Sequence, residues 1–262
     1  MTTPSAVLIE RQGPIGVITI NRPEVMNALN VPTLLLLEEA LGELEGDDGV
    51  RVIVVTGAGE KAFVAGGDIA DLDSRRGLAH YREFAEVIHR CFRRFEVCEK
   101  PTIAAVNGWA LGGGVELLLS LDIRIVAETA RFGLPEITLG LFPGAGGSQR
   151  ILRQMSPCRA REIVFTGDHF KAPEALGWGL VNRVVPAAEL MATTLEMAGK
   201  IAAKSPLTLR LLKRTLRDGA DMPLANALAY EQAMIGLVLD SEDAHEGCRA
   251  FLEKRPAAFT GR

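Results

Sequence analysis

The sequence reads WALGGGVEL at residues 109–117, where a strand-like apolar run at residues 103–106 leads into a helix-like apolar run at residues 115–121. Glycines at such a junction let a ligand approach the backbone closely, because no Cβ stands in the way. The first amides of a helix have no partner within it, and the helix dipole adds partial positive charge there. Glu116 follows in the first turn, so an oxygen polarised by the Gly113 amide would lie near a carboxylate that can move protons.

The rest of the chain predicts an α/β protein that ends in helices. Strand-like and helix-like runs alternate up to about residue 185. Strands are expected at residues 6–10, 15–20, 51–56, 101–106, 123–127 and 180–185. Helices are expected from a cap at Asn30 to residue 44, and at residues 79–96, 187–204, 206–217, 223–239 and 241–254. The division predicted from this change of character is a catalytic core at residues 1–185 and a helical region at residues 186–262.

Composition bounds the class of protein. The chain has 262 residues, of which 48% are hydrophobic and 24% charged, which is ordinary for a globular protein. Its net charge of −4 argues weakly against nucleic acid as the main partner. The four cysteines form no CxxC or Cys/His cluster and the four histidines have no metal-ligand spacing, so we expect a reduced, cytoplasmic location and no metal. We expect no signal peptide and no membrane partner, because no apolar run approaches the ~20 residues that cross a bilayer.

A second glycine-rich loop and a second glutamate complete a candidate site. The loop KAFVAGGD at residues 61–68 follows an expected strand and offers further backbone amides. Two amides from separate loops that point at one carbonyl oxygen form an oxyanion hole. One helix, one strand and one turn separate Glu116 from Glu136, so the chain can return to place the two carboxyls face to face. Such a pair can act as acid and base.

Two other motifs predict different functions and fail in context. Residues 57–62, GAGEKA, match a dinucleotide-binding fingerprint, but FVAGG follows where a helix is required. Residues 146–150, GGSQR, lack the last glycine of a serine-hydrolase nucleophile elbow.

Five ordered motifs together resemble the enoyl-CoA hydratase/isomerase (crotonase) superfamily, and most of all its bacterial-type enoyl-CoA hydratases. They are NRP at 21–23 with NAL at 27–29, KAFVAGGDI at 61–69, VNGWALGGGVEL at 106–117, RFGLPE at 131–136 and FPGAGGSQR at 142–150. The resemblance implies an α/β fold with a crotonase-like ββα spiral core and a C-terminal helical trimerisation part, in a homotrimer or homohexamer. It also implies an acyl-CoA thioester substrate and stabilisation of a thioester enolate.

The resemblance assigns roles to individual residues. The amides of Ala65 and Gly113 would form the oxyanion hole, and Glu116 and Glu136 would hold and activate water, with Glu136 favoured as the acid. It implies contacts with the acyl-CoA for Met26, Ala28, Lys61, Ala65, Gly66, Gly67, Asp68, Ile69, Trp109, Gly112, Pro135, Lys254 and Phe259. Lys254 and Phe259 would close a CoA site that could belong to a neighbouring subunit. Trp109 stands where relatives often have tyrosine, and a packing role is expected for it.

The activity implied is hydration of a 2-enoyl-CoA to a 3-hydroxyacyl-CoA, as in the β-oxidation of fatty acids. No cofactor is expected, because the thioester is itself the electron sink and coenzyme A is part of the substrate. The alternatives are a Δ3,Δ2-enoyl-CoA isomerase, another acyl-CoA enzyme of the same fold, and a non-catalytic CoA-thioester-binding protein. The presence of both glutamates favours the hydratase.

Overall fold

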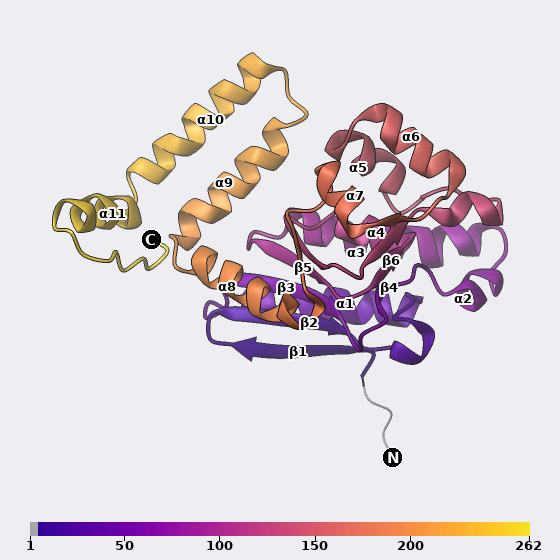
Figure 1. Cartoon of the computed structure of the whole chain (residues 1–262). Helices are drawn as coiled ribbons and strands as arrows, with labels where there is room; N and C mark the ends of the chain where they lie inside the picture. Colours follow the sequence, from indigo (N-terminus) through magenta and orange to yellow (C-terminus); the bar gives the residue numbers. More distant parts are fainter. Residues whose placement is uncertain (1–4) are drawn as a thin grey trace.

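The computed structural model describes residues 5–262, and its strands form two sheets, one with six strands and one with four (Figure 1). The larger sheet has the order β1-β2-β3-β5-β7-β10. Its strands are β1 (Val7–Gln12), β2 (Ile15–Ile20), β3 (Val52–Gly57), β5 (Thr102–Val106), β7 (Ile123–Ala127) and β10 (Arg183–Val185). Only β1 and β2 pair antiparallel; the other neighbours are parallel. All six strands were predicted, with small shifts at their ends.

Both faces of the larger sheet are covered, which explains the continuous apolar run of β3. Along this strand Ile53 and Val55 belong to one core cluster, while Val52 and Val54 belong to another. The first cluster includes residues of α1 (Val31–Gly46) and α3 (Glu86–Val97), and the second includes residues of α8 (Leu190–Ala202). Successive strand residues point to opposite faces, so a strand buried on both sides has no polar alternation.

The smaller sheet was not predicted. It has the order β4-β6-β8-β9, formed by β4 (Ala62–Val64), β6 (Trp109–Leu111), β8 (Arg131–Gly133) and β9 (Phe170–Lys171). Strands of two or three residues are too short to show a period in sequence. The glycine-rich junction therefore consists of strand β6 followed at once by α4 (Gly113–Leu118), whose six residues are all buried.

The segments between the strands include several short helices. They are η1 (Pro23–Val25), α2 (Ile69–Asp73), η2 (His80–Ala85), η3 (Pro135–Leu139), α5 (Gly147–Gln154), α6 (Pro157–Thr166) and α7 (Ala172–Gly177). The single helix expected at residues 79–96 is a π-helical segment, η2, followed by α3. The cap predicted at Asn30 is confirmed, because its side chain accepts a hydrogen bond from the Thr33 amide at 3.0 Å.

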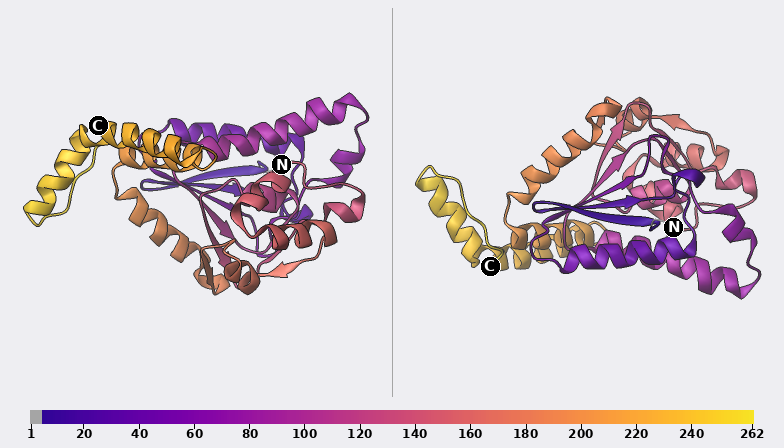
Figure 2. Two further views of the ribbon diagram at one scale, coloured as in Figure 1. Left: turned by 90° about the horizontal axis from the view of Figure 1, so that it is seen from above. Right: turned by 90° about the horizontal axis from the view of Figure 1, so that it is seen from below.

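The C-terminal helices divide into two groups. After η4 (Ala187–Glu189), α8 packs on the larger sheet, although it lies beyond the boundary expected at residue 185. The remaining helices, α9 (Pro206–Gly219), α10 (Leu224–Leu239) and α11 (Glu242–Leu252), extend away from the sheets as an arm (Figures 1 and 2). Packing thus places the start of the arm after α8. Over residues 5–262, no helix is both long enough and apolar enough to span a membrane.

Candidate active site

A cavity of about 610 Å³ brings together the residues that the sequence placed at the glycine-rich junction. Gly113 and Glu116 come from α4, Glu136 from η3 and Gly67 from the loop after β4. The remaining lining is mainly apolar and comes from α2, η2, α3 and the segment before α5: Leu72, Phe84, Ala85, Ile88, Leu141 and Phe142. The cavity therefore has a polar wall with two carboxyls and a wall suited to an acyl chain.

Two backbone amides lie close together on the polar wall. A Cβ built on Gly113 would lie 3.6 Å from the Gly67 nitrogen, so the two glycines face each other closely. Within residues 5–262 neither amide donates to a protein acceptor. Gly113 is the first residue of α4, where an amide has no acceptor inside the helix. Two amides that lie so close together are candidates to donate to one carbonyl oxygen.

The expectation that Ala65 supplies the second donor is corrected by its hydrogen bonding. The Ala65 amide donates to the carbonyl oxygen of Met26 at 3.1 Å and is not available to a ligand. The chain around Gly67 is held by Leu29, whose amide donates to the Gly66 oxygen at 2.8 Å and whose carbonyl accepts from the Asp68 amide at 2.8 Å. These bonds engage the chain on either side of Gly67, and Gly67 itself lines the cavity.

Glu116 is held by backbone donors although it is almost fully buried. Its Oε1 accepts from the amides of Ala145 and Gly147, at 2.7 and 2.8 Å. Burial raises the pKa of Glu116 to about 7, and the nearby Glu136 carboxyl acts in the same direction. The two amide bonds oppose this rise because they stabilise the ionised form. Oε1 is thus engaged by the protein, and Oε2 is the oxygen that can meet a ligand.

Glu136 lies opposite with less support. Burial raises its pKa, and its Oε2 is buried without a hydrogen-bond partner in the part of the chain described. A Cβ on Gly112 would stand only 3.0 Å from Glu136 Oε1, and Gly112 has φ +49°. Glycine at 112 therefore makes room for this carboxyl and permits the left-handed backbone that turns β6 into α4.

The residues expected to hold coenzyme A lie apart from this cavity. Met26 and Lys61 line a second cavity of about 330 Å³, together with Pro23 and Gly59. Ala28 accepts a hydrogen bond from Arg22 through its carbonyl oxygen. The structure therefore brings Met26 and Lys61 together at a site next to the loop that carries Gly67.

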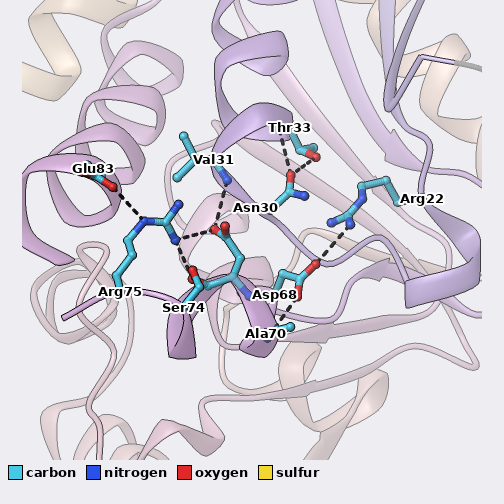
Figure 3. A network of polar contacts seen from close by, with 10 residues as sticks. Arg22, Asn30, Val31, Thr33, Asp68, Ala70, Ser74, Arg75 and Glu83 are labelled. Atoms are coloured by element: carbon cyan, nitrogen blue, oxygen red, sulfur yellow. Dashed lines mark hydrogen bonds and ion pairs between the residues drawn. The ribbon is translucent and has the colours of Figure 1, made fainter. Parts of the chain in front are cut away.

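Asp68 has a structural position, which Figure 3 shows. Its Oδ1 caps α2 by accepting from the Ala70 and Asp71 amides, and its Oδ2 pairs with Arg22 at 3.1 Å. Ile69, the first residue of α2, is exposed. The contacts of Asp68 make it a helix cap, which differs from the substrate contact expected.

A neighbouring network in Figure 3 holds the apolar wall in place. Arg75 pairs with Asp71 of α2 at 3.0 Å and with Glu83 of η2 at 3.5 Å. Asp71 also accepts from the Val31 amide at the start of α1, at 3.3 Å. One arginine thus joins two wall segments to the core helix α1.

The other expected residues do not line this cavity. Trp109 packs edge-on against His169 with ring centroids 5.3 Å apart, which fits the packing role expected. Pro135 begins η3 and so precedes Glu136 directly. Phe259 packs beside Gly247 of α11, and Lys254 follows α11 with φ +54°, so both belong to the arm.

Sequence reasoning did not identify the two amides that hold Glu116. Ala145 and Gly147 lie in the motif FPGAGGSQR, which was used only for the resemblance. Its glycines were the available signal, because Gly146 has φ +101° and turns the backbone so that both neighbouring amides reach one oxygen.

Comparisons with known proteins agree on one family. The family model described as enoyl-CoA hydratase/isomerase matches residues 10–262. The short-chain-enoyl-CoA hydratase of Clostridium acetobutylicum is 45% identical over 249 residues, covering 95% of each chain. The crotonyl-CoA hydratase of Syntrophomonas wolfei is 42% identical and covers 98% of each. A solved enoyl-CoA hydratase from Bacillus anthracis superposes with a TM-score of 0.95 at 37% identity, covering 98% of this chain and 100% of that one.

Proposed function

The chain belongs to the enoyl-CoA hydratase/isomerase family and is an enoyl-CoA hydratase, a hydro-lyase; from this premise we propose that Gly67, Gly113, Glu116 and Glu136 carry the reaction. The observation on which the proposal rests is the shared cavity, in which two unpaired amides and two carboxyls meet. A carbonyl oxygen bound by both amides would lie beside both acids.

The amides act on the thioester. Hydrogen bonds from Gly67 and Gly113 draw electron density onto the thioester oxygen, which makes the β-carbon of a 2-enoyl group electrophilic. They also stabilise the enolate that forms when water adds. One such donor contributes on the order of 3 kcal/mol to lowering a barrier. This is why Gly67 replaces Ala65 in the proposal, since the Ala65 amide is already bonded.

The carboxyls divide the work of base and acid. Only Glu116 accepts two backbone hydrogen bonds, which favour its ionised form, while Glu136 has a buried oxygen with no donor among residues 5–262. Two close, buried carboxyls hold one proton between them. We therefore assign the charge to Glu116, which takes a proton from water as the oxygen bonds to the β-carbon. Glu136 gives its proton to the α-carbon, and a proton passed from Glu116 to Glu136 restores the pair.

The substrate is an acyl-CoA thioester, and we propose a short 2-enoyl chain. The two curated relatives named above are called short-chain-enoyl-CoA and crotonyl-CoA hydratases. Met26 and Lys61 would contact coenzyme A at the second cavity, and the wall with Leu72 and Phe84 would contact the acyl group. The thioester provides the electron sink, so the proposed reaction calls for no cofactor.

The arm supports the proposal of a homotrimer, alone or paired as a hexamer. No residue of α10 is buried in the single chain. Large apolar side chains on α9 and α10 are exposed, including Leu216, Leu224, Leu228, Ile235 and Leu237. A second copy of the chain would cover this surface, and Lys254 and Phe259 would then approach a neighbouring subunit. A cytoplasmic location stays a prediction from the sequence.

Crotonyl-CoA in ¹⁸O-labelled water tests the function. We expect loss of the enoyl-thioester absorbance and label in a 3-hydroxyacyl product. Double-bond migration without label would indicate an isomerase, and binding without any absorbance change would indicate a non-catalytic protein. Glu116→Gln and Glu136→Gln are the controls, and both should bind the thioester while losing turnover.

A further inference from the structure

A partly buried arginine contacts the loop that holds Glu116. Arg150 is in α5, and only 14% of its side chain is exposed. One terminal nitrogen donates to the carbonyl oxygen of Ala145 at 3.1 Å, and the other donates to Glu96 Oε2 at 3.0 Å. Ala145 is also the residue whose amide donates to Glu116 Oε1 at 2.7 Å. Arg150 and Glu116 therefore hold the two polar groups of the same residue.

The loop is shaped to admit this guanidinium. A Cβ on Gly146 would come far inside contact distance of an Arg150 terminal nitrogen, and Gly146 also has φ +101°. Any side chain at 146 would thus displace the arginine as well as strain the backbone. Arg150 Nε is buried without an acceptor in the part of the chain described. An unsatisfied buried donor is unfavourable. The hydrogen bonds to Ala145 and Glu96 must therefore offset this cost to hold Arg150 in place.

Glu96 keeps the arginine in place from the end of α3. Burial would raise the pKa of Glu96, but hydrogen bonds from Arg150 and Arg93 lower it, so Glu96 stays ionised. A carboxylate at a helix C-terminus meets the negative end of the helix dipole, and the two arginines compensate for this. The chain of contacts thus runs from α3 through Glu96 and Arg150 to the loop before α5.

We propose that Arg150, held by Glu96, is a positioning residue that fixes the Ala145–Gly147 loop on Glu116 and keeps the Glu116 carboxyl ionised as the base. The inference rests on the proposed function of Glu116. Arg150 does not line the substrate cavity itself, but it contacts Ala145, which does. It acts through this loop and through its charge. Its positive charge also favours the Glu116 carboxylate, although less strongly than the hydrogen bonds from the Gly147 and Ala145 amides do.

The other ionisable groups around Glu116 do not share this role. Glu136 from η3 has the opposite effect on the Glu116 carboxyl. His80 and Tyr81 of η2 line the same cavity, and the His89 ring of α3 contacts the Gly144 carbonyl oxygen. Removal of Arg150 therefore takes away a positive charge and the hydrogen bond to the Ala145 carbonyl oxygen. None of these other groups supplies both.

The pH dependence of crotonyl-CoA hydration separates charge from scaffolding. Arg150→Met should lower kcat about tenfold or more through loss of alignment. It should also move the low-pH limb of kcat/KM upward by roughly half to one pH unit, because the ionised base loses an opposite charge. Arg150→Lys keeps the positive charge but cannot make both hydrogen bonds, to Ala145 and to Glu96. Its kcat should therefore fall, while the low-pH limb of kcat/KM stays near the wild-type position. Glu96→Gln leaves the guanidinium unneutralised and should move the limb downward.

Arg153→Met is the matched control. Arg153 lies on the same helix, is 58% exposed and pairs with the exposed Asp221 at 3.2 Å. Its removal should change neither kcat nor the limb. The proposal would be overturned if kcat/KM falls at the same low pH in wild type, Arg150→Met and Glu96→Gln while their melting temperatures are unchanged. If Arg150→Met does not fold, the pH at which kcat/KM falls in Arg150→Lys and in Glu96→Gln provides the same test.

A second readout is independent of turnover. The carboxyl of Glu116 can be titrated by NMR in protein labelled with ¹³C at the glutamate carboxyl, with Glu116→Gln to assign the signal. An upward shift of this pKa in Arg150→Met supports the inference even if crotonyl-CoA is not the substrate. An unchanged titration rejects the inference even if the protein is an active hydratase.

Discussion

The two walls of the active-site cavity are built in different ways. On the polar wall, all six residues of α4 are buried, and Glu116 is held by two amides from another segment. On the apolar wall, neither α2 nor η2 has a buried residue, and ion pairs around Arg75 hold them to the core. Reacting atoms need fixed geometry, whereas an acyl tail needs only apolar surface. Changes to the polar wall should therefore reduce turnover, and changes to the apolar wall should alter the preference for the acyl chain.

The largest effect is expected for Gly113→Pro, which removes one amide donor of the polar wall. Proline is tolerated at the first position of a helix, so α4 should still form. We expect kcat to fall by about a hundredfold to a thousandfold. Gly113→Ala is the control, because it retains the amide and its Cβ would have no contact closer than 3.6 Å. A folded Gly113→Pro with wild-type kcat would exclude this donor.

Glu136→Gln should lower kcat by at least about a hundredfold, the scale of general acid catalysis. The melting temperature should hardly change, because the buried Oε2 has no donor within residues 5–262 to lose. Stopped-flow absorbance with crotonyl-CoA and a thermal melt measure the two quantities. A folded Glu136→Gln variant with wild-type kcat would contradict the role assigned to Glu136.

The pH profile should show a smaller and graded effect. Burial and the neighbouring Glu136 raise the pKa of Glu116 to about 7. The base is protonated below that pH, so kcat/KM should fall as pH decreases through about 7. Steady-state rates measured from pH 5 to 9 would give the pH midpoint of this decline to within about one pH unit. A rate that stays level well below pH 6 would contradict the requirement for ionised Glu116.

The smallest effect is expected on the apolar wall. Arg75→Met removes the pairs to Asp71 and Glu83 and should loosen α2 and η2. We expect a change of about twofold to fivefold in KM for longer 2-enoyl-CoA substrates, consistent with ~1 kcal/mol or less, and little change in kcat for crotonyl-CoA. Arg76→Met is the matched control for Arg75→Met, because Arg76 is exposed and its one ion pair within residues 5–262 is with the exposed Asp73. A large loss of kcat in Arg75→Met alone would show that the two walls are coupled.

Much of the fold was predictable because its signals are local. The apolar runs of β3, β5 and β7 indicate strands buried on both faces, and Asn30 indicates the start of α1. The short strands β4, β6 and β9 were missed, since they are defined by their partners in the smaller sheet. The helix α8 itself was predicted from its local pattern, but its packing on the larger sheet depends on distant residues and was visible only in the structure.

For the site, the residue types and their order in the chain came from the sequence alone: three glycines before Glu116, a glycine loop before Asp68, and Glu136 after a short strand. Only the tertiary structure decided which amides are unpaired. The Ala65 amide is taken by Met26 and the Gly67 amide is not, and Glu116 is held by a loop near residue 146 that Arg150 supports. The physical reason is that a hydrogen-bond donor is free or occupied according to its neighbours in space, and these neighbours come from distant parts of the chain.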